Sequence, residues 1–212
     1  MTRVCLTSRN VGILACLTLI GPEVRAVIVY DNLSATTSAE GTVGGSIQQA
    51  QRIAPLSVSH TLTSITLLMS GSSTGARLAL YSGDESTPST EIGVLLSPGS
   101  ITSERGENIF TTPGLTLNAG VNYWVVLSAD SGGFSWAYTD SNTGLGEGYA
   151  SNWANNLGGG WQPFDNEPFQ MSVEATAVPE PATLVFHASL ALAGLALVKG
   201  LRKQRPPVLA HS

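Results

Sequence analysis

Apolar and polar side chains alternate over much of the chain between residues 27 and 177, which is the periodicity of a β-strand with one buried face. In the clearest stretch every second residue is apolar: Phe169, Met171, Val173 and Ala175. Residues 134–138 repeat the pattern with three aromatic rings. Residues 122–129 are rich in aromatic and β-branched residues, which predicts a central strand.

Strand-forming residues bounded by Gly, Pro, Ser, Thr or Asn recur along this region and predict nine strands: 27–30, 46–53, 57–69, 77–81, 92–96, 107–110, 122–129, 134–138 and 169–176. No segment of the region shows helical periodicity. We therefore expect an all-β ectodomain at residues 27–177, an antiparallel β-sandwich of jelly-roll-like form. The predicted buried positions include Leu78, Leu80, Trp124, Val126 and Val173.

The end of the chain follows a different pattern. Residues 182–198 form a mostly apolar run, and residues 184–198 are apolar on all sides except at His187 and Ser189. Seventeen helical residues would span roughly 25 Å, close to the hydrocarbon thickness of a bilayer. This predicts a single transmembrane helix, whereas a C-terminal core helix is the alternative. The cations that follow would stop transfer and keep the tail cytoplasmic: Lys199, Arg202, Lys203 and Arg205.

A short proline motif precedes that apolar run: Val178, Pro179, Glu180 and Pro181. With the helix at 182–198 and the basic cluster at 199–205, residues 178–205 resemble the PEP-CTERM sorting signal of exported proteins in Gram-negative bacteria. The resemblance implies an intermediate anchored in the inner membrane, processing by an exosortase near the two prolines, and a final place in the cell envelope or outside the cell. His187 and the seven-residue tail at 206–212 depart from the usual pattern.

The first 26 residues predict a secretory signal peptide. Residues 1–10 carry two arginines and no acid, residues 11–20 are apolar, and Val24-Arg25-Ala26 suits a cleavage site. We expect export through the Sec translocon and cleavage after Ala26. A lipoprotein signal ending at Cys16 is the alternative.

Cysteines and charge narrow the choice of function. Both cysteines, Cys5 and Cys16, lie in the predicted signal peptide, so the mature chain would form no disulfide. Residues 27–177 contain three arginines and thirteen acids, a net charge of −10. Such a domain would be repelled by phosphates, and we expect no nucleic-acid partner.

Three segments of the middle region carry a second resemblance. Residues 77–83 (Arg-Leu-Ala-Leu-Tyr-Ser-Gly), 117–120 (Leu-Asn-Ala-Gly) and 123–128 (Tyr-Trp-Val-Val-Leu-Ser) are similar to the choice-of-anchor β-domains. These domains precede varied surface-anchoring signals. The resemblance implies an extracellular module without an established activity, and it supplies no catalytic residues.

Residues 71–75 match the Gly-x-Ser-x-Gly pattern of a hydrolase nucleophile elbow, with Ser73 as the nucleophile. The pattern has meaning only on a strand–turn–helix, followed by an acid and a histidine. A strand is predicted to follow, and His60 is the only histidine in residues 27–177. We therefore expect no enzymatic activity and no cofactor, and a hydrolase is the least favoured class.

Asp140, Asn142 and Glu147 have oxygen side chains that could bind Ca²⁺. The remaining ligand positions of an EF-hand loop and its flanking helices are missing. An Asx-rich turn before Gly144 is the favoured interpretation.

Eight of the fourteen aromatic residues fall between residues 134 and 169. Loop aromatics beside amides could stack on sugar rings, and the predicted glycan contacts are Tyr149, Trp153, Asn155 and Trp161. Core packing or loop anchoring is the alternative role for the same rings. Two function classes follow: a non-catalytic envelope or matrix protein displayed through the sorting signal, and a glycan-binding module with an exopolysaccharide partner.

Overall fold

The computed structural model describes residues 3–5, 16–18, 25–112 and 114–178, and the chain divides into two units at Val178. Most of the predicted signal peptide lies outside the described residues. So do Pro179 to Pro181 of the proline motif, the apolar run at 182–198, the basic cluster and the tail. No helix in the described ranges is long and apolar enough to cross a membrane.

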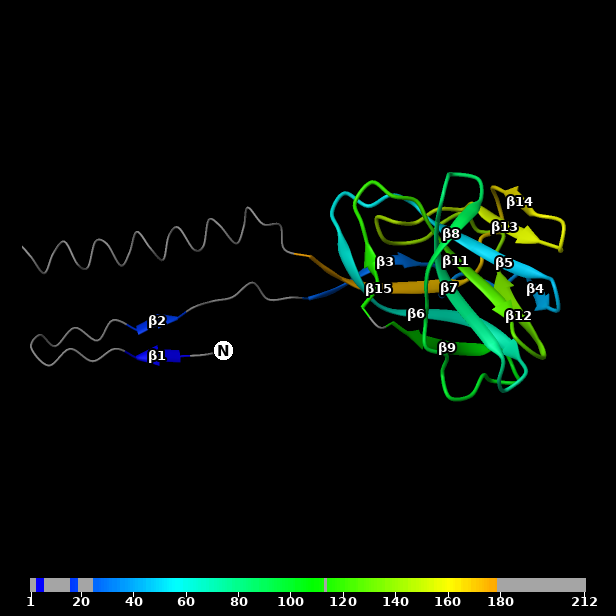
Figure 1. Ribbon diagram of the computed structural model, residues 1–212, viewed down its shortest axis with the longest axis horizontal. Helices are drawn as coiled ribbons and strands as arrows, with labels where there is room; N and C mark the ends of the chain where they lie inside the picture. Colours follow the sequence, from blue (N-terminus) through cyan, green and yellow to red (C-terminus); the bar gives the residue numbers. More distant parts are fainter. Residues whose placement is uncertain (1–2, 6–15, 19–24, 113, 179–212) are drawn as a thin grey trace, which may run out of the picture. The chain divides into compact units, whose positions relative to one another are not determined.

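Every regular element of the described residues is a β-strand, and all strand pairs are antiparallel (Figure 1). A short pair forms near the start of the chain from β1 (Arg3–Cys5) and β2 (Cys16–Thr18). The seven-stranded sheet consists of β3 (Ala26–Asp31), β4 (Ala39–Gly44), β6 (His60–Gly71), β9 (Gly106–Thr111), β10 (Thr116–Leu117), β12 (Gly133–Tyr138) and β15 (Met171–Ala177).

The six-stranded sheet runs in the order β14-β13-β5-β11-β7-β8. Its members are β5 (Gln48–Ile53), β7 (Ala76–Gly83), β8 (Pro88–Val94), β11 (Tyr123–Ala129), β13 (Trp153–Asn156) and β14 (Trp161–Phe164). Side chains of both sheets meet in one hydrophobic core, which makes the fold sandwich-like. The all-β prediction is confirmed, and each of the nine predicted strands has a counterpart.

The predicted buried residues are buried, each with at most 1% of its surface exposed. Leu78, Leu80 and Val173 belong to the core between the sheets, whereas Trp124 and Val126 belong to a separate small cluster. Alternate residues of a strand point to opposite faces, so Val125 and Leu127 supply the core from the same strand as Trp124 and Val126.

Two buried glutamines connect the core to the loops. The Gln51 Nε2 group donates to the carbonyl oxygens of Ala150 and Asn152, each at 2.9 Å, and Gln51 Oε1 accepts from the Phe169 backbone N–H at 2.9 Å. Gln170 Nε2 donates to the Ala35 carbonyl oxygen at 2.7 Å. These amides fix loops that have no ladder of their own, because buried polar groups must find partners.

The first and last strands of the domain are neighbours. β3 pairs with β15 through Ala26 opposite Thr176, and β15 also pairs with β6 on its other side. Figure 1 shows β3 and β15 side by side. The start and the end of the domain therefore leave it at adjacent points of the same sheet.

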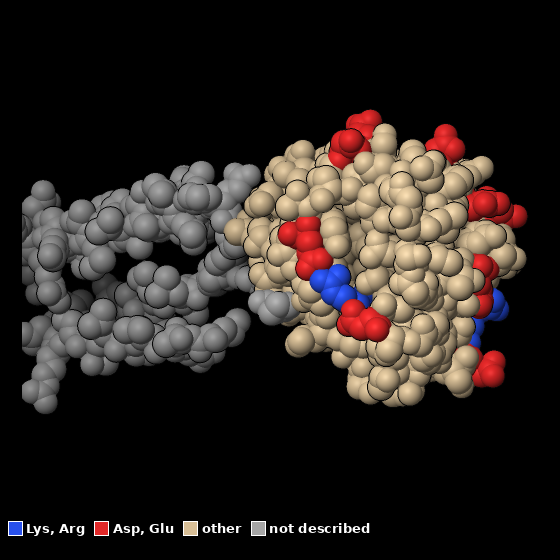
Figure 2. Space-filling model, turned by 45° about the vertical axis from the view of Figure 1, so that its right-hand side comes forward, with Lys and Arg blue, Asp and Glu red and all other residues tan. Residues whose placement is uncertain are grey.

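Most of the surface shown in Figure 2 is uncharged; among its charged side chains acidic ones predominate, and the few basic ones lie beside acids. The three arginines of residues 27–177 each have an acidic partner: Arg52 with Glu85 at 3.9 Å, Arg77 with Glu91 at 2.7 Å, and Arg105 with Glu40 at 3.5 Å. The described surface of the domain thus offers no basic patch to an anionic partner.

Tyr30 is fully buried, and its hydroxyl donates to the Ala150 carbonyl oxygen at 3.3 Å. Burial, assisted by Tyr149 and Asp31, raises the pKa of Tyr30 well above its ordinary value. The folded state therefore holds this proton to a higher pH than the unfolded chain. The resulting stability is fully present below about pH 10 and is lost as pH rises from there through the folded pKa.

We expect Tyr30→Phe to flatten the loss of stability above about pH 10, because phenylalanine has no proton to release. At pH 7 the variant should lose only about 0.5–1.5 kcal/mol, the net contribution of one hydrogen bond. Urea titrations of wild type and variant at pH 7 and above about pH 10 measure these changes in the free energy of unfolding. Parallel alkaline losses in the two proteins would contradict the assignment.

Candidate functional site

The outer face of the six-stranded sheet, which points away from the seven-stranded sheet, carries a row of small side chains. The strand register places Ala154 opposite Ala50, Ala50 opposite Val126, and Val126 opposite Ala79. Residues paired across antiparallel strands lie on the same face. Pro163 of β14 extends this row beyond Ala154. We call these five residues the small-residue row.

Aromatic rings cover the row. Tyr81 and Trp161 are half-buried and pack against the cluster formed by Ala50, Val126, Ala154 and Trp124. Alanines leave room for rings to lie against the sheet, since a larger side chain would hold them away. Each ring therefore has one side against protein and part of its surface in solvent.

Trp124 lies on the same face, but the loop after β7 covers it completely. Its Nε1 donates to the Asp84 carbonyl oxygen at 3.1 Å. A Cβ at Gly83 would collide with the carbonyl oxygen of Thr87 and lie 2.9 Å from the Trp124 ring. Glycine at this position lets the loop lie directly on the tryptophan.

Tyr81 is held by a charged pair at one end of the face. Arg77 Nη2 donates to both oxygens of Glu91 at 2.7 and 2.8 Å, and the Tyr81 hydroxyl donates to Glu91 Oε2 at 2.9 Å. The hydrogen bond from Arg77 lowers the pKa of Glu91, and burial and then the bond to Glu91 raise the pKa of Tyr81. At neutral pH the carboxylate is ionised and the phenol is protonated, which fixes the ring.

Arg52 of β5 lies on the same face, opposite Trp124 of β11 and two residues along the strand from Ala50. Its guanidinium donates to Asn122 Oδ1 at 2.7 and 3.0 Å and to Asn152 Oδ1 at 2.9 Å. Only 12% of this side chain is exposed. Because the oxygen of Asn152 is bonded to Arg52, the amide nitrogen of Asn152 is the group that can donate outward.

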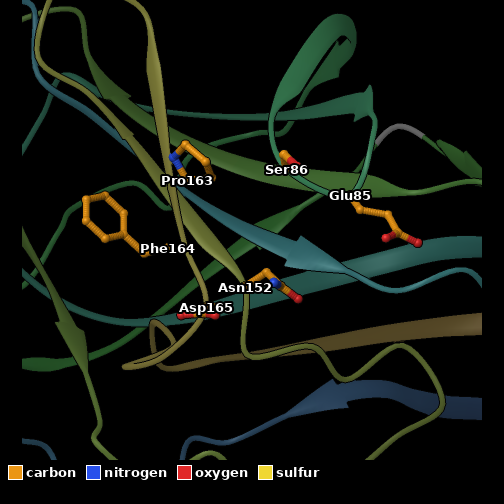
Figure 3. A pocket seen from close by; sticks show the side chains of 6 residues that line it. All are labelled: Glu85, Ser86, Asn152, Pro163, Phe164 and Asp165. Carbon is orange, nitrogen blue, oxygen red and sulfur yellow. The ribbon is translucent and has the colours of Figure 1, made fainter.

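A hollow of about 310 Å³ opens beside Arg52, at the β14 end of the small-residue row. It is lined by Glu85, Ser86, Asn152, Pro163, Phe164 and Asp165. Figure 3 shows Glu85 and Ser86 on one side, Pro163, Phe164 and Asp165 on the other, and Asn152 between them. The hollow combines carboxylates, an amide and a hydroxyl, whereas the Phe164 ring points away from these groups in Figure 3 and stacks on Trp153.

The structure separates the four predicted glycan contacts. Trp161 lies on the outer face, whereas Trp153 is on the inner side, opposite Gln51 in the register. The Trp153 ring stacks on Phe164 at 4.2 Å and its Nε1 donates to the Asn166 carbonyl oxygen. Tyr149 packs against the core near Tyr30, and Asn155 lies opposite Gln49. These four residues do not form one surface.

Sequence reasoning missed Tyr81, Asn152, Asp165 and Glu85, which the structure places around the hollow and the small-residue row. Tyr81 lies on the outer face through strand register, Asn152 and Asp165 directly flank β13 and β14 and line the hollow, and Glu85 belongs to the covering loop. The signal in the sequence that could have indicated this face was the alternation of small and large residues within each strand.

The predicted calcium ligands lie in the connection between β12 and β13. Asp140 and Asn142 are exposed, and Glu147 Oε1 accepts from the Ser57 backbone N–H at 2.6 Å. Hydrogen bonds from Ser57 lower the pKa of Glu147. The part of the chain that the structure describes contains no group of three or more His, Cys, Asp or Glu side chains that could hold a metal ion.

Ser73 lies in the turn between β6 and β7, so a strand follows it rather than a helix. His60 begins β6 and its Nδ1 is 2.9 Å from the Val58 carbonyl oxygen. The 12 residues of β6 rise by about 3.3 Å each, which places the two ends of the strand roughly 36 Å apart. His60 is therefore out of reach of Ser73.

Comparison with known proteins does not assign the chain to a family. No family model matches the sequence, and no curated protein matches it either.

Proposed function

We propose that this is an exported, non-catalytic protein of the cell envelope or extracellular matrix, displayed through a PEP-CTERM sorting signal. The observation that carries the proposal is the order of three features at the end of the chain: the motif at 178–181, the apolar run at 182–198 and the basic cluster at 199–205. An exosortase and the Sec translocon would be its processing partners. The inner membrane would hold the intermediate.

The positions of the first and last strands of the domain support this role. The strand that ends at Ala177 comes directly before the motif, so no further folded element separates the domain from the proposed processing site. β3 begins at Ala26, the proposed signal-peptide cleavage site. Both targeting segments could be removed without loss of any strand from β4 to β15.

We further propose a jelly-roll-like β-sandwich of the choice-of-anchor type. The support is that most strand neighbours are distant in sequence, such as β3 with β15, β5 with β11 and β6 with β15. Sandwiches with long crossover connections, rather than meanders of consecutive hairpins, have this property.

Replacing both Pro179 and Pro181 with alanine should block processing and leave membrane insertion intact, because those positions carry the resemblance to the exosortase signal. The full-length protein would be expressed in a host that has an exosortase, and the mature C-terminus would be determined by mass spectrometry. Wild type should be cleaved near 179–181, and the double variant should keep its C-terminal residues.

A matched control replaces Pro206 and Pro207 with alanine in the tail, where two prolines also occur close together. This variant should be processed as wild type. Normal processing of Pro179→Ala/Pro181→Ala would contradict the sorting-signal interpretation. So would equal processing of wild type in a host without an exosortase. Either result would favour a plain membrane anchor.

A further inference from the structure

We propose that the outer face of the six-stranded sheet binds a neutral polysaccharide chain, which lies over the aromatic rings that cover the small-residue row, from the hollow at β14 to the Tyr81–Glu91 pair. This goes beyond display of the domain and does not depend on how the ends of the chain are processed. Of the four glycan contacts predicted from the sequence, the proposed surface includes Trp161.

The first argument is the placement of the two aromatic rings. Trp161 and Tyr81 rest on opposite parts of the same apolar cluster, one on β14 and the other on β7. Four strand spacings separate these strands, which is roughly 19 Å. Aromatic rings that expose part of their surface bind the apolar C–H faces of sugars. Two of them at this separation suit an extended oligosaccharide rather than a single sugar.

The second argument is the polar groups at the two ends of the same face. At the β14 end Asn152 offers its amide nitrogen, and Asp165 and Glu85 offer carboxylate oxygens. At the β7 end Glu91 is ionised and held in place by Arg77. Donors and acceptors fixed by protein hydrogen bonds can bind sugar hydroxyls without a large cost in side-chain ordering.

The third argument is charge, which selects a neutral ligand. Both arginines of this face have acidic partners, and Arg52 also donates to two asparagine oxygens. Glu85, Glu91 and Asp165 leave the face with one negative charge in excess, and residues 27–177 carry −10 in total. A polymer of uronic acids or phosphates would be repelled.

The test uses the purified full-length protein in detergent micelles. A glycan array of neutral and uronic-acid oligosaccharides selects a ligand, and titration of intrinsic tryptophan fluorescence then gives its Kd. We expect binding to a neutral glycan that is stronger for longer oligomers. Trp161→Ala and Tyr81→Ala should each weaken the Kd roughly two- to tenfold, and the double variant should combine both losses.

Conservative and distant variants separate binding from folding. Trp161→Tyr and Tyr81→Phe keep the rings and should retain most of the affinity. Ile109→Ala removes an exposed side chain from the outer face of the other sheet and should bind as wild type. The melting temperature of each variant should stay close to that of wild type.

Three results would overturn the proposal. The first is no binding to any neutral glycan on the array. The second is binding restricted to anionic glycans. The third is unchanged affinity in the Trp161→Ala/Tyr81→Ala variant, which would place any sugar site elsewhere. The processing experiment on the proline motif is unaffected by each of these results.

Discussion

Replacing Trp136 with alanine should lower the free energy of unfolding of the domain by about 3–5 kcal/mol, the range for removing a large aromatic side chain from a core. Trp136 is completely buried, and its ring stacks on Phe169 with centroids 4.7 Å apart. Its Nε1 also donates to the Gln170 carbonyl oxygen at 3.0 Å. Domains of this size are stabilised by about 5–15 kcal/mol, so the variant should lose a large fraction of its stability.

Urea titration of residues 27–177, followed by circular dichroism, measures this effect. Trp161→Ala is the matched control, because Trp161 is half-buried and packs only on the small outer cluster. It should cost less than about 1.5 kcal/mol, a fraction of the full burial of an aromatic side chain. Similar losses in the two variants would mean that the outer cluster is as important to stability as the core.

Gln51→Leu should also destabilise the domain strongly, by about 2–5 kcal/mol. The substitution conserves approximate size but removes the bonds to the Ala150 and Asn152 carbonyl oxygens and to the Phe169 N–H. The Phe169 N–H would be buried without a partner, which costs about 1–3 kcal/mol. The two carbonyl oxygens keep their bonds from the Tyr30 hydroxyl and the Arg52 N–H, but each loses a further bond with a net contribution of about 0.5–1.5 kcal/mol. The segment that carries Asn152 should also loosen, so glycan binding should weaken in the fraction that remains folded.

Gln49 provides a matched control two residues earlier on the same strand. It is also buried, but its Nε2 makes one bond, to the Thr42 carbonyl oxygen at 3.1 Å, and its Oε1 has no partner. Gln49→Leu therefore removes an unsatisfied oxygen together with one hydrogen bond and should change stability by less than about 1 kcal/mol. A Gln49→Leu loss as large as that of Gln51→Leu would contradict the role given to the Gln51 amide.

The strands with regular alternation could be predicted from the sequence, because a buried core demands an apolar residue at every second position. β15 and β12 are examples. β4 and β13 were not predicted, since β4 buries only Val43 and β13 consists of Trp-Ala-Asn-Asn. Their pairing depends on neighbouring strands that are distant in sequence.

The candidate site was harder to predict because an aromatic residue alone does not reveal its face. Trp153 and Trp161 lie in neighbouring strands, and the register that puts them on opposite faces follows from the partners Gln51 and Asn156. Trp124 was expected to be buried and is buried, but a loop covers it rather than the second sheet. Alternation along a strand shows which residues share a face, but it shows which face this is only when one residue of the strand is known to be buried or exposed.

The position of β15 matters for how the domain would bear a mechanical load. If the protein is held by its C-terminus, tension enters at Ala177, at the end of a strand flanked by β3 and β6. Pulling out an interior strand must break two hydrogen-bonded ladders, whereas an edge strand is held by one. Resistance to forced unfolding is set by the rate of unfolding rather than by equilibrium stability. Attachment through β15 should therefore make forced unfolding of an anchored domain slow under shear.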